Sequence, residues 1–262
     1  MTEDQLEHLI RASGAILGDS EVWIIGSQSL LPWLREKAGQ PPRSWPRVFT
    51  LSTEADIIPV DDDSKKIDLV DGVLGEDSYF HDSFGAYAQG VSMKTAVLPE
   101  GWQSRCYPLK NPNTMGVTGY CLHPADLFIA KSVANREKDS EFLDALIEYG
   151  LVKEKTVLHL LPKVSRLDSP SLDALRERIL GRFRKIQKNL HRIGEGCELF
   201  DPGHGRINTR IVSVTNDTVV LQHAGREKVL DAVIPPEQRQ ALKELEGQRV
   251  VLQFGAQGLE RV

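Results

Sequence analysis

The sequence predicts a mixed α/β protein, in which a sheet flanked by helices is followed by a helical extension and a small β-barrel-like domain. Apolar runs of strand length alternate with segments of helical periodicity in the first half of the chain. A helical pattern then fills most of the second half, and β-type runs return after the Pro-Gly segment at 202–205. We therefore expect three parts, at residues 1–155, 156–195 and 203–262.

Composition and charge exclude several classes of protein. The chain has 262 residues, 40% of them hydrophobic, and a net charge of -5, which excludes a uniformly basic nucleic-acid-binding protein but leaves room for a local basic face. No apolar run is long enough to span a bilayer, and the acidic, polar first residues do not form a secretory signal. Cys106, Cys121 and Cys197 lie far apart without metal-ligand spacing, so we expect a reduced, cytoplasmic protein.

The first predicted part alternates helices and strands. Apolar residues recur at helical spacing up to Leu17, and the apolar run at 22–25 suits a strand buried on both faces. Three adjacent aspartates at 61–63 cannot converge on one ion from a strand, so we expect them to cap the next helix. The predicted elements are helix 4–17, strand 22–25, helix 28–38, extended segments 48–51 and 53–59, helix 66–74, a hairpin of 91–98 with 105–109, and strand 117–122.

The remaining predicted elements are helices and then strands. They are a helix starting at His123-Pro124, helices 140–149, 153–161 and 168–190, strands 207–215, 219–223 and 249–254, and a short helix at 236–245. The helix at 168–190 is basic. Its charged face is either simply solvated or contacts a nucleic-acid backbone through Arg178, Arg182 and Lys185.

The first candidate site combines a Gly-Ser turn with carboxylates on the next strand. Gly26 lets the backbone approach a ligand closely, and Ser27 opens a helix whose N-terminus favours an anion. Glu54 and Asp56 alternate on one strand, so their carboxylates share a face and suit a metal ion, with Asp68 as a further candidate from elsewhere. Position 58, two residues after Asp56, is an isoleucine and offers no ligand. The alternative is that Asp56 caps a turn or pairs with Lys131 or Arg136.

The second candidate group lies in the helical half of the chain. Lys131 follows an apolar helical stretch and is placed to reach a phosphate at the sheet edge, with Arg136 and Asp139 nearby in sequence. The alternative is a structural salt-bridge network among Asp126, Arg136 and Asp139. His81 and His123 are available as general bases near neutral pH, but both are isolated in sequence, so we expect ordinary hydrogen-bonding roles for them.

These residues fall into motifs that resemble a bacterial nucleotidyltransferase-like family, a distant relative of the AbiEii abortive-infection toxins. The motifs, in order over residues 1–155, are Gly26-Ser27-Gln28, Ser52-x-Glu54-x-Asp56 with Pro59, Gly75-Glu76-x-Ser78-x-Phe80-His81, Leu98-Pro99-x-Gly101-Trp102-x-x-Arg105, and Asp126-Leu127 followed by Lys131, Arg136, Lys138 and Asp139. The resemblance implies a nucleotidyltransferase-like mixed sheet that uses an NTP and Mg²⁺.

The resemblance also implies roles for individual residues. Gly26, Ser27, Gln28 and Arg136 are expected to bind the nucleotide, and Asp56 and Glu54 the metal. Lys131 and Asp139 complete the expected catalytic set. The departure is Ile58, where active nucleotidyltransferases place the second metal carboxylate.

The end of the chain resembles the small KfrB-type domain of plasmid-borne proteins. The matching residues are Gly203-His204-Gly205-Arg206, Val212, Val220-x-Gln222-His223, Gly225-Arg226, Gly247-x-x-Val250 and Phe254-Gly255. Together the two resemblances predict a toxin–antitoxin, defence or mobile-element protein that transfers a nucleotide from NTP to an RNA or protein acceptor. The alternative is a catalytically degenerate fold that binds nucleic acid, an antitoxin or another partner protein.

Overall fold

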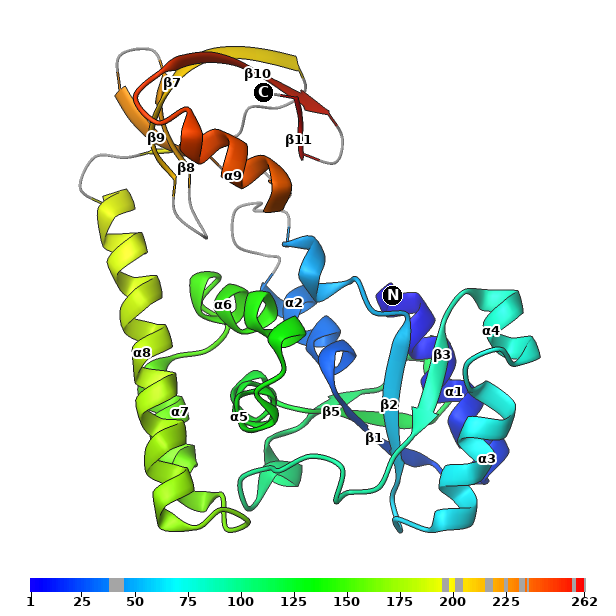
Figure 1. The fold of residues 1–262 in the computed structure, drawn as a ribbon. Helices are drawn as coiled ribbons and strands as arrows, with labels where there is room; N and C mark the ends of the chain where they lie inside the picture. Colours follow the sequence, from blue (N-terminus) through cyan, green and yellow to red (C-terminus); the bar gives the residue numbers. More distant parts are fainter. Residues whose placement is uncertain are drawn as a thin grey trace. The chain divides into compact units, whose positions relative to one another are not determined.

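The structure is a computed structural model that describes residues 1–37, 45–194, 198–200, 205–214, 219–223, 226–230, 234, 236–255 and 258–261. Cys197 and the predicted end of the second helix at residue 38 lie outside these residues. The chain forms two compact units, Met1–Phe183 and Arg184–Val262, and each is described by itself (Figure 1). No helix in the described part of the chain is both long and apolar enough to cross a membrane.

A five-stranded mixed sheet forms the centre of the first unit. Its strands are β1 (Glu21–Ile25), β2 (Glu54–Pro59), β3 (Tyr87–Gly90), β4 (Tyr107–Leu109) and β5 (Thr118–Cys121), in the order β3-β2-β1-β5-β4. The central strand β1 is antiparallel to β2 and parallel to β5. The edge strand β3 is parallel to β2, and β4 is antiparallel to β5. The predicted mixed sheet with flanking helices is confirmed.

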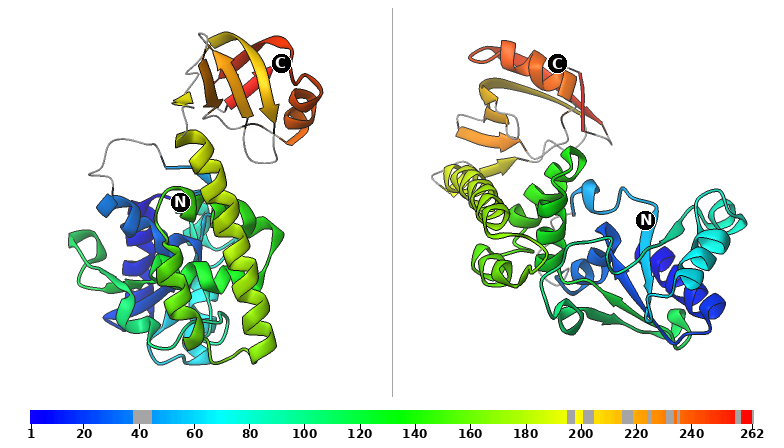
Figure 2. Two further views of the ribbon diagram at one scale, coloured as in Figure 1. Left: turned by 90° about the vertical axis from the view of Figure 1, so that its left-hand side faces the viewer. Right: turned by 60° about the horizontal axis from the view of Figure 1, so that its bottom comes forward.

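One face of this sheet is covered by α1 (Glu3–Leu17) and α3 (Ser64–Leu74), with α4 (Tyr79–Phe84) beside them (Figures 1 and 2). A Cβ added to Gly119 of β5 would lie only 2.4 Å from the Cδ1 atom of Ile10, which shows how closely α1 approaches the sheet. As predicted, the acidic turn caps α3, because the Asp63 carboxylate accepts hydrogen bonds from the backbone of Lys65 and Lys66.

The other helices of the first unit lie on the opposite side of the sheet. They are α2 (Leu31–Lys37), α5 (Pro124–Ala134), α6 (Ser140–Glu148), α7 (Glu154–Leu160) and the first part of α8 (Ser169–Gly194). The side chains of Phe128 on α5 and Phe183 on α8 pack with ring centroids 5.7 Å apart, so α8 is fixed to the core of this unit.

Two predicted strands of the first unit are wrong. The segment 48–51 contributes to a 3-10 turn, Arg47–Phe49, because Phe49 is fully buried against Phe142 rather than alternating across a sheet. The segment 91–98 is no strand, and β4 pairs with β5 instead of forming a hairpin with it. Arg166 donates hydrogen bonds of 3.0 Å to the carbonyls of Lys94 and Ala96, so a side chain satisfies groups that a strand partner would otherwise bind.

The second unit is built on a six-stranded sheet. Its elements are β6 (Glu198–Phe200), β7 (Gly205–Val214), β8 (Val219–His223), β9 (Arg226–Leu230), α9 (Pro236–Glu244), β10 (Arg249–Gly255) and β11 (Gly258–Arg261). The strand order is β11-β10-β7-β8-β9-β6, so within the described residues the sheet stays open instead of closing into the expected barrel. Ile211, Leu221, Leu242 and Leu252 are fully buried in its core, with α9 packed on β7.

Candidate functional site

The turn after β1 lies directly against Asp56. The register pairs Ile25, the last residue of β1, with Asp56 on β2. Gly26 then adopts φ +71° and ψ -169°, a backbone region that is essentially restricted to glycine. A Cβ at this position would lie 1.9 Å from Oδ2 of Asp56, which is a steric overlap. Gly26 is therefore required both for the turn and for the approach of the backbone to the carboxylate.

Glu54 and Asp56 lie two residues apart on β2, so their side chains share a face. Burial, followed by repulsion from the Glu54 carboxylate, raises the pKa of Asp56 from 3.8 to about 7, although Lys131 and Arg136 pull it down. Two negative charges have thus been placed in a poorly solvated position. Such a pair is stabilised by a proton or by a cation.

Tyr87 joins this pair from the neighbouring strand. The parallel register of β2 and β3 pairs Tyr87 with Glu54, and the Tyr87 hydroxyl donates a 3.2 Å hydrogen bond to Oε2 of Glu54. Burial and the Glu54 charge raise the pKa of Tyr87 to about 12, so the hydroxyl keeps its proton. The His81 ring packs on Tyr87 at 4.7 Å, while its Nδ1 accepts a hydrogen bond from the backbone of Asp77.

Lys131 on α5 and Arg136 in the turn after α5 supply positive charge to the site. The Lys131 ammonium lies 2.5 Å from Oδ1 of Asp139 and 4.8 Å from the centre of the Phe142 ring. Asn135 ends α5 in the left-handed conformation, with φ 50°, and so reverses the chain. The structure therefore brings together five of the predicted residues around Gly26, namely Glu54, Asp56, Lys131, Arg136 and Asp139.

Two other residues of the Gly-Ser motif are placed less favourably for a nucleotide. Ser27 opens the 3-10 turn Ser27–Leu30, whose four residues make only a short helical terminus. Gln28 is fully buried, and neither atom of its side-chain amide has a hydrogen-bond partner among the described residues. A direct contact between the Gln28 side chain and a nucleotide would require the side chain to move.

The carboxylates available for a metal are Glu54 and Asp56. Ile58 is fully buried and pairs with Trp23 in the sheet, and Asp68 is exposed on α3. Within the described ranges, no group of three or more His, Cys, Asp or Glu side chains could hold a metal ion. Mg²⁺ is commonly bound by one or two carboxylates together with water and substrate phosphates, so the pair fits this ion.

The alternative of a structural salt-bridge network among Asp126, Arg136 and Asp139 is wrong. Asp126 is fully buried and makes a bidentate ion pair with Arg105, with N–O distances of 2.7 and 2.9 Å, whereas Asp139 pairs with Lys131. His123 caps α5, because its Nδ1 accepts a hydrogen bond from the backbone of Ala125, and burial lowers its pKa. His81 and His123 therefore both make ordinary structural hydrogen bonds.

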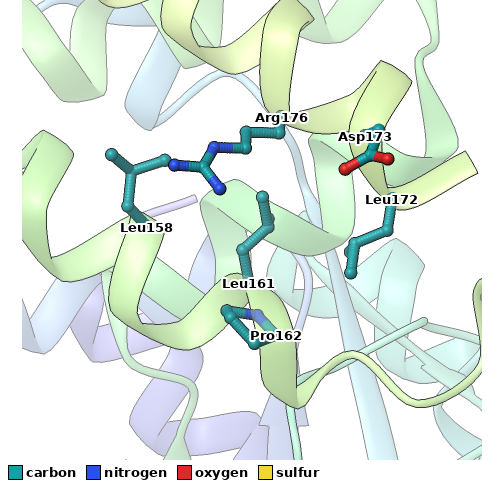
Figure 3. A pocket seen from close by; sticks show the side chains of 6 residues that line it. All are labelled: Leu158, Leu161, Pro162, Leu172, Asp173 and Arg176. Atoms are coloured by element: carbon teal, nitrogen blue, oxygen red, sulfur yellow. The ribbon is translucent and has the colours of Figure 1, made fainter. Parts of the chain in front are cut away.

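The arginines predicted to make up a basic face on α8 are turned toward neighbouring helices. Arg178 donates a 2.7 Å hydrogen bond to the carbonyl of Ser132, and Arg182 binds Ser140 and the Asp144 carboxylate. Lys185 also takes part in an interaction. A hollow near the start of α8 is lined by Leu158 and Leu161 on one side and Arg176 on the other, and it contains none of the predicted site residues (Figure 3).

The site lies within a recognised sequence family. The sequence profile described as nucleotidyltransferase of unknown function (DUF6036) matches residues 5–178, which is more than half of the chain. The chain belongs to this family. The matched segment contains the Gly26 turn, the carboxylate pair and the two cations. No curated protein and no solved structure matches the chain.

The contact between Tyr87 and Glu54 was not predicted from the sequence. The motifs place an aromatic-rich segment at 76–87, but no spacing rule pairs it with the carboxylate strand. Two parallel neighbours in a sheet are joined by a long connection, here 27 residues between Pro59 and Tyr87. The only available signal was the density of aromatic and polar residues in this segment.

Proposed function

We propose that this member of the nucleotidyltransferase family transfers a nucleotide from an NTP to an acceptor hydroxyl, with Mg²⁺ held by Glu54 and Asp56. The observation that carries the proposal is the position of this half-buried carboxylate pair beside the Gly26 turn. Nucleotidyl transfer requires positioning and charge neutralisation more than covalent chemistry. The residues around Gly26 offer both positioning and charge neutralisation.

The chain's own residues have separate roles in this proposal. The Gly26 turn brings the backbone against the Asp56 carboxylate, because no side chain separates them, so a phosphate on the bound metal would lie beside this turn. Lys131 and Arg136 bind phosphate oxygens, and Asp139 holds the Lys131 ammonium in place before the nucleotide arrives. Bound Mg²⁺ would neutralise the developing charge on the transferred phosphoryl group. Tyr87 keeps the Glu54 carboxylate oriented by its hydrogen bond.

The acceptor and biological setting that we propose follow from the resemblances in the sequence. The resemblance of the sequence motifs to AbiEii toxins and to the KfrB-type domain favours a toxin–antitoxin, defence or mobile-element protein. Its acceptor would be an RNA end or a protein hydroxyl, and an antitoxin would be its partner. Both acceptors are proposed from motif similarity.

The proposal is tested with the full chain, each of the four α-³²P-labelled NTPs, Mg²⁺ and total RNA. We expect label to appear in RNA or in a protein band, and to disappear in Asp56→Asn and Glu54→Gln. Asp68→Asn removes an exposed carboxylate of the same unit and should transfer at the wild-type rate. Absence of transfer with every NTP, or transfer that survives both site variants, would refute the proposal.

A second candidate function is binding without catalysis. It is favoured by the small number of metal ligands, because Asp139 is paired with Lys131 and position 58 is a buried isoleucine, which leaves Glu54 and Asp56. In this case Mg²⁺ and NTP would bind, as measured by equilibrium dialysis, without any labelled product. Binding that is lost in Asp56→Asn but never accompanied by transfer would support this candidate over the first.

A further inference from the structure

The exposed face of the second sheet carries arginines that the proposed transfer reaction does not use. Along β7, Ile207, Thr209 and Ile211 are buried, so the alternating residues Arg206 and Arg210 are exposed on the opposite face. The neighbouring strand β10 pairs Arg249 with Arg210 and Gln253 with Arg206, and Arg249 is also exposed. We call these three arginines the arginine face.

The strands that carry this face supply no negative charge to it. The sequences of β7, β8 and β10 contain neither Asp nor Glu, and the register places Glu227 of β9 beyond Gln222. Arg206 donates to the side chain of Gln253 and Arg210 to the carbonyl of Gly247, so both guanidinium groups keep free donors. None of the three arginines forms an ion pair with any described residue. Since like charges directly opposite on neighbouring strands destabilise a sheet, the pairing of Arg210 with Arg249 favours an anionic partner.

The arginine face is a local concentration of positive charge. From Glu198, where the second sheet begins, the sequence has eight Lys and Arg against nine Asp and Glu, a net charge of -1. The positive charge therefore lies in the placement of the three arginines on one face and not in the composition of this part of the chain. Arginine forks match phosphate oxygens in geometry and are less strongly hydrated than lysine ammonium groups.

We infer that the arginine face binds single-stranded RNA through its phosphates. Neighbouring strands place Arg210 and Arg249 about 5 Å apart between Cα atoms, and Arg206 lies four residues away along β7, about 13 Å. A flexible single strand adapts its phosphates to these unequal spacings, while a rigid duplex does not. The exposed amide of Gln222, paired with Arg210 across β8, offers hydrogen bonds to bases. This inference depends on the proposed function in that the RNA would be the acceptor.

The test measures equilibrium binding of a fluorescein-labelled single-stranded RNA to the full chain, without NTP, over a range of salt concentrations. Each phosphate contact to a single strand contributes about 0.7 to the slope of log Kd against log salt, so three contacts give a slope of about 2. Arg249→Gln should lower this slope by about 0.7 and weaken binding. The variant with all three arginines replaced by Gln should abolish the salt-dependent binding.

Lys243→Gln on α9 is the matched control, because it removes one exposed charge from the same unit and should bind like the wild type. Arg249 has no intrachain partner in the described residues, so its replacement should leave the fold intact, as checked by circular dichroism. Asp56→Asn should also bind RNA like the wild type, which separates failure of this inference from failure of the proposed transfer. Unchanged binding by the triple variant, equal affinity for duplex RNA, or equal displacement by poly-glutamate would overturn the inference.

Discussion

Asp56→Asn should make the first unit more stable, and more so as the pH rises. The folded protein raises the pKa of Asp56 from 3.8 to about 7, first by burial and second by the Glu54 charge. Between these two values the native state holds a proton that the unfolded chain releases, so the wild type loses stability as pH increases through this window. At about 1.36 kcal/mol per pH unit, the full loss above pH 7 is about 4 kcal/mol. An asparagine, which has no charge to bury, does not suffer this loss.

The measurement is urea unfolding followed by tryptophan fluorescence. All four tryptophans, at positions 23, 33, 45 and 102, lie in the first unit, so the signal reports that unit alone. Linkage over this window predicts that the advantage of Asp56→Asn over the wild type grows by about 3 kcal/mol between pH 5 and pH 8.5. Asp68→Asn, at an exposed position, should stay within about 0.5 kcal/mol of the wild type. A stability difference between Asp56→Asn and the wild type that is constant or shrinks as the pH rises would refute the claim that burial and the Glu54 charge raise the pKa of Asp56.

Three further substitutions test other parts of the site and its support. Gly26→Ala should abolish transfer and lower the melting temperature by about 5 °C, because an alanine in this backbone conformation is strained by about 1–3 kcal/mol. The control is Gly72→Ala, which adds a methyl group into open space on α3 and should raise the melting temperature slightly. Tyr87→Phe should weaken Mg²⁺ binding about tenfold, measured by calorimetric titration, because Glu54 loses its orienting hydrogen bond; unchanged binding would contradict that role. Asp126→Asn should destabilise the first unit by about 3 kcal/mol in urea, since it leaves the half-buried Arg105 guanidinium without its fully buried charged partner; a cost below about 1 kcal/mol would show that the ion pair is not structural.

Local rules account for the parts of the site that lie on one element. The alternation of a strand predicts that Glu54 and Asp56 share a face, and a glycine after a buried strand predicts the close approach of the backbone. Helix caps were also predictable, as with the acidic turn before α3. In each case the residues that decide the geometry are within a few positions of one another.

Contacts between distant elements were not predictable in this way. Lys131 and Asp139 are eight residues apart, and they meet because Asn135 reverses the chain in a left-handed conformation that non-glycine residues rarely adopt. The Arg166 side chain donates hydrogen bonds to carbonyls of the loop 91–98, more than 60 residues away in sequence, so this loop does not join the sheet although its composition is strand-like. A single sequence contains no spacing that encodes such pairs.

The charge balance of the site favours a metal–nucleotide complex over an empty structural role. Three carboxylates, of Glu54, Asp56 and Asp139, face two cations, of Lys131 and Arg136, so the fully ionised group carries one excess negative charge. Near neutral pH a proton on Asp56 removes this excess. A divalent cation in place of the proton would leave the group with one positive charge, which suits an anionic triphosphate. A purely structural network would be expected to balance its charges without a carboxyl group whose pKa has risen to about 7.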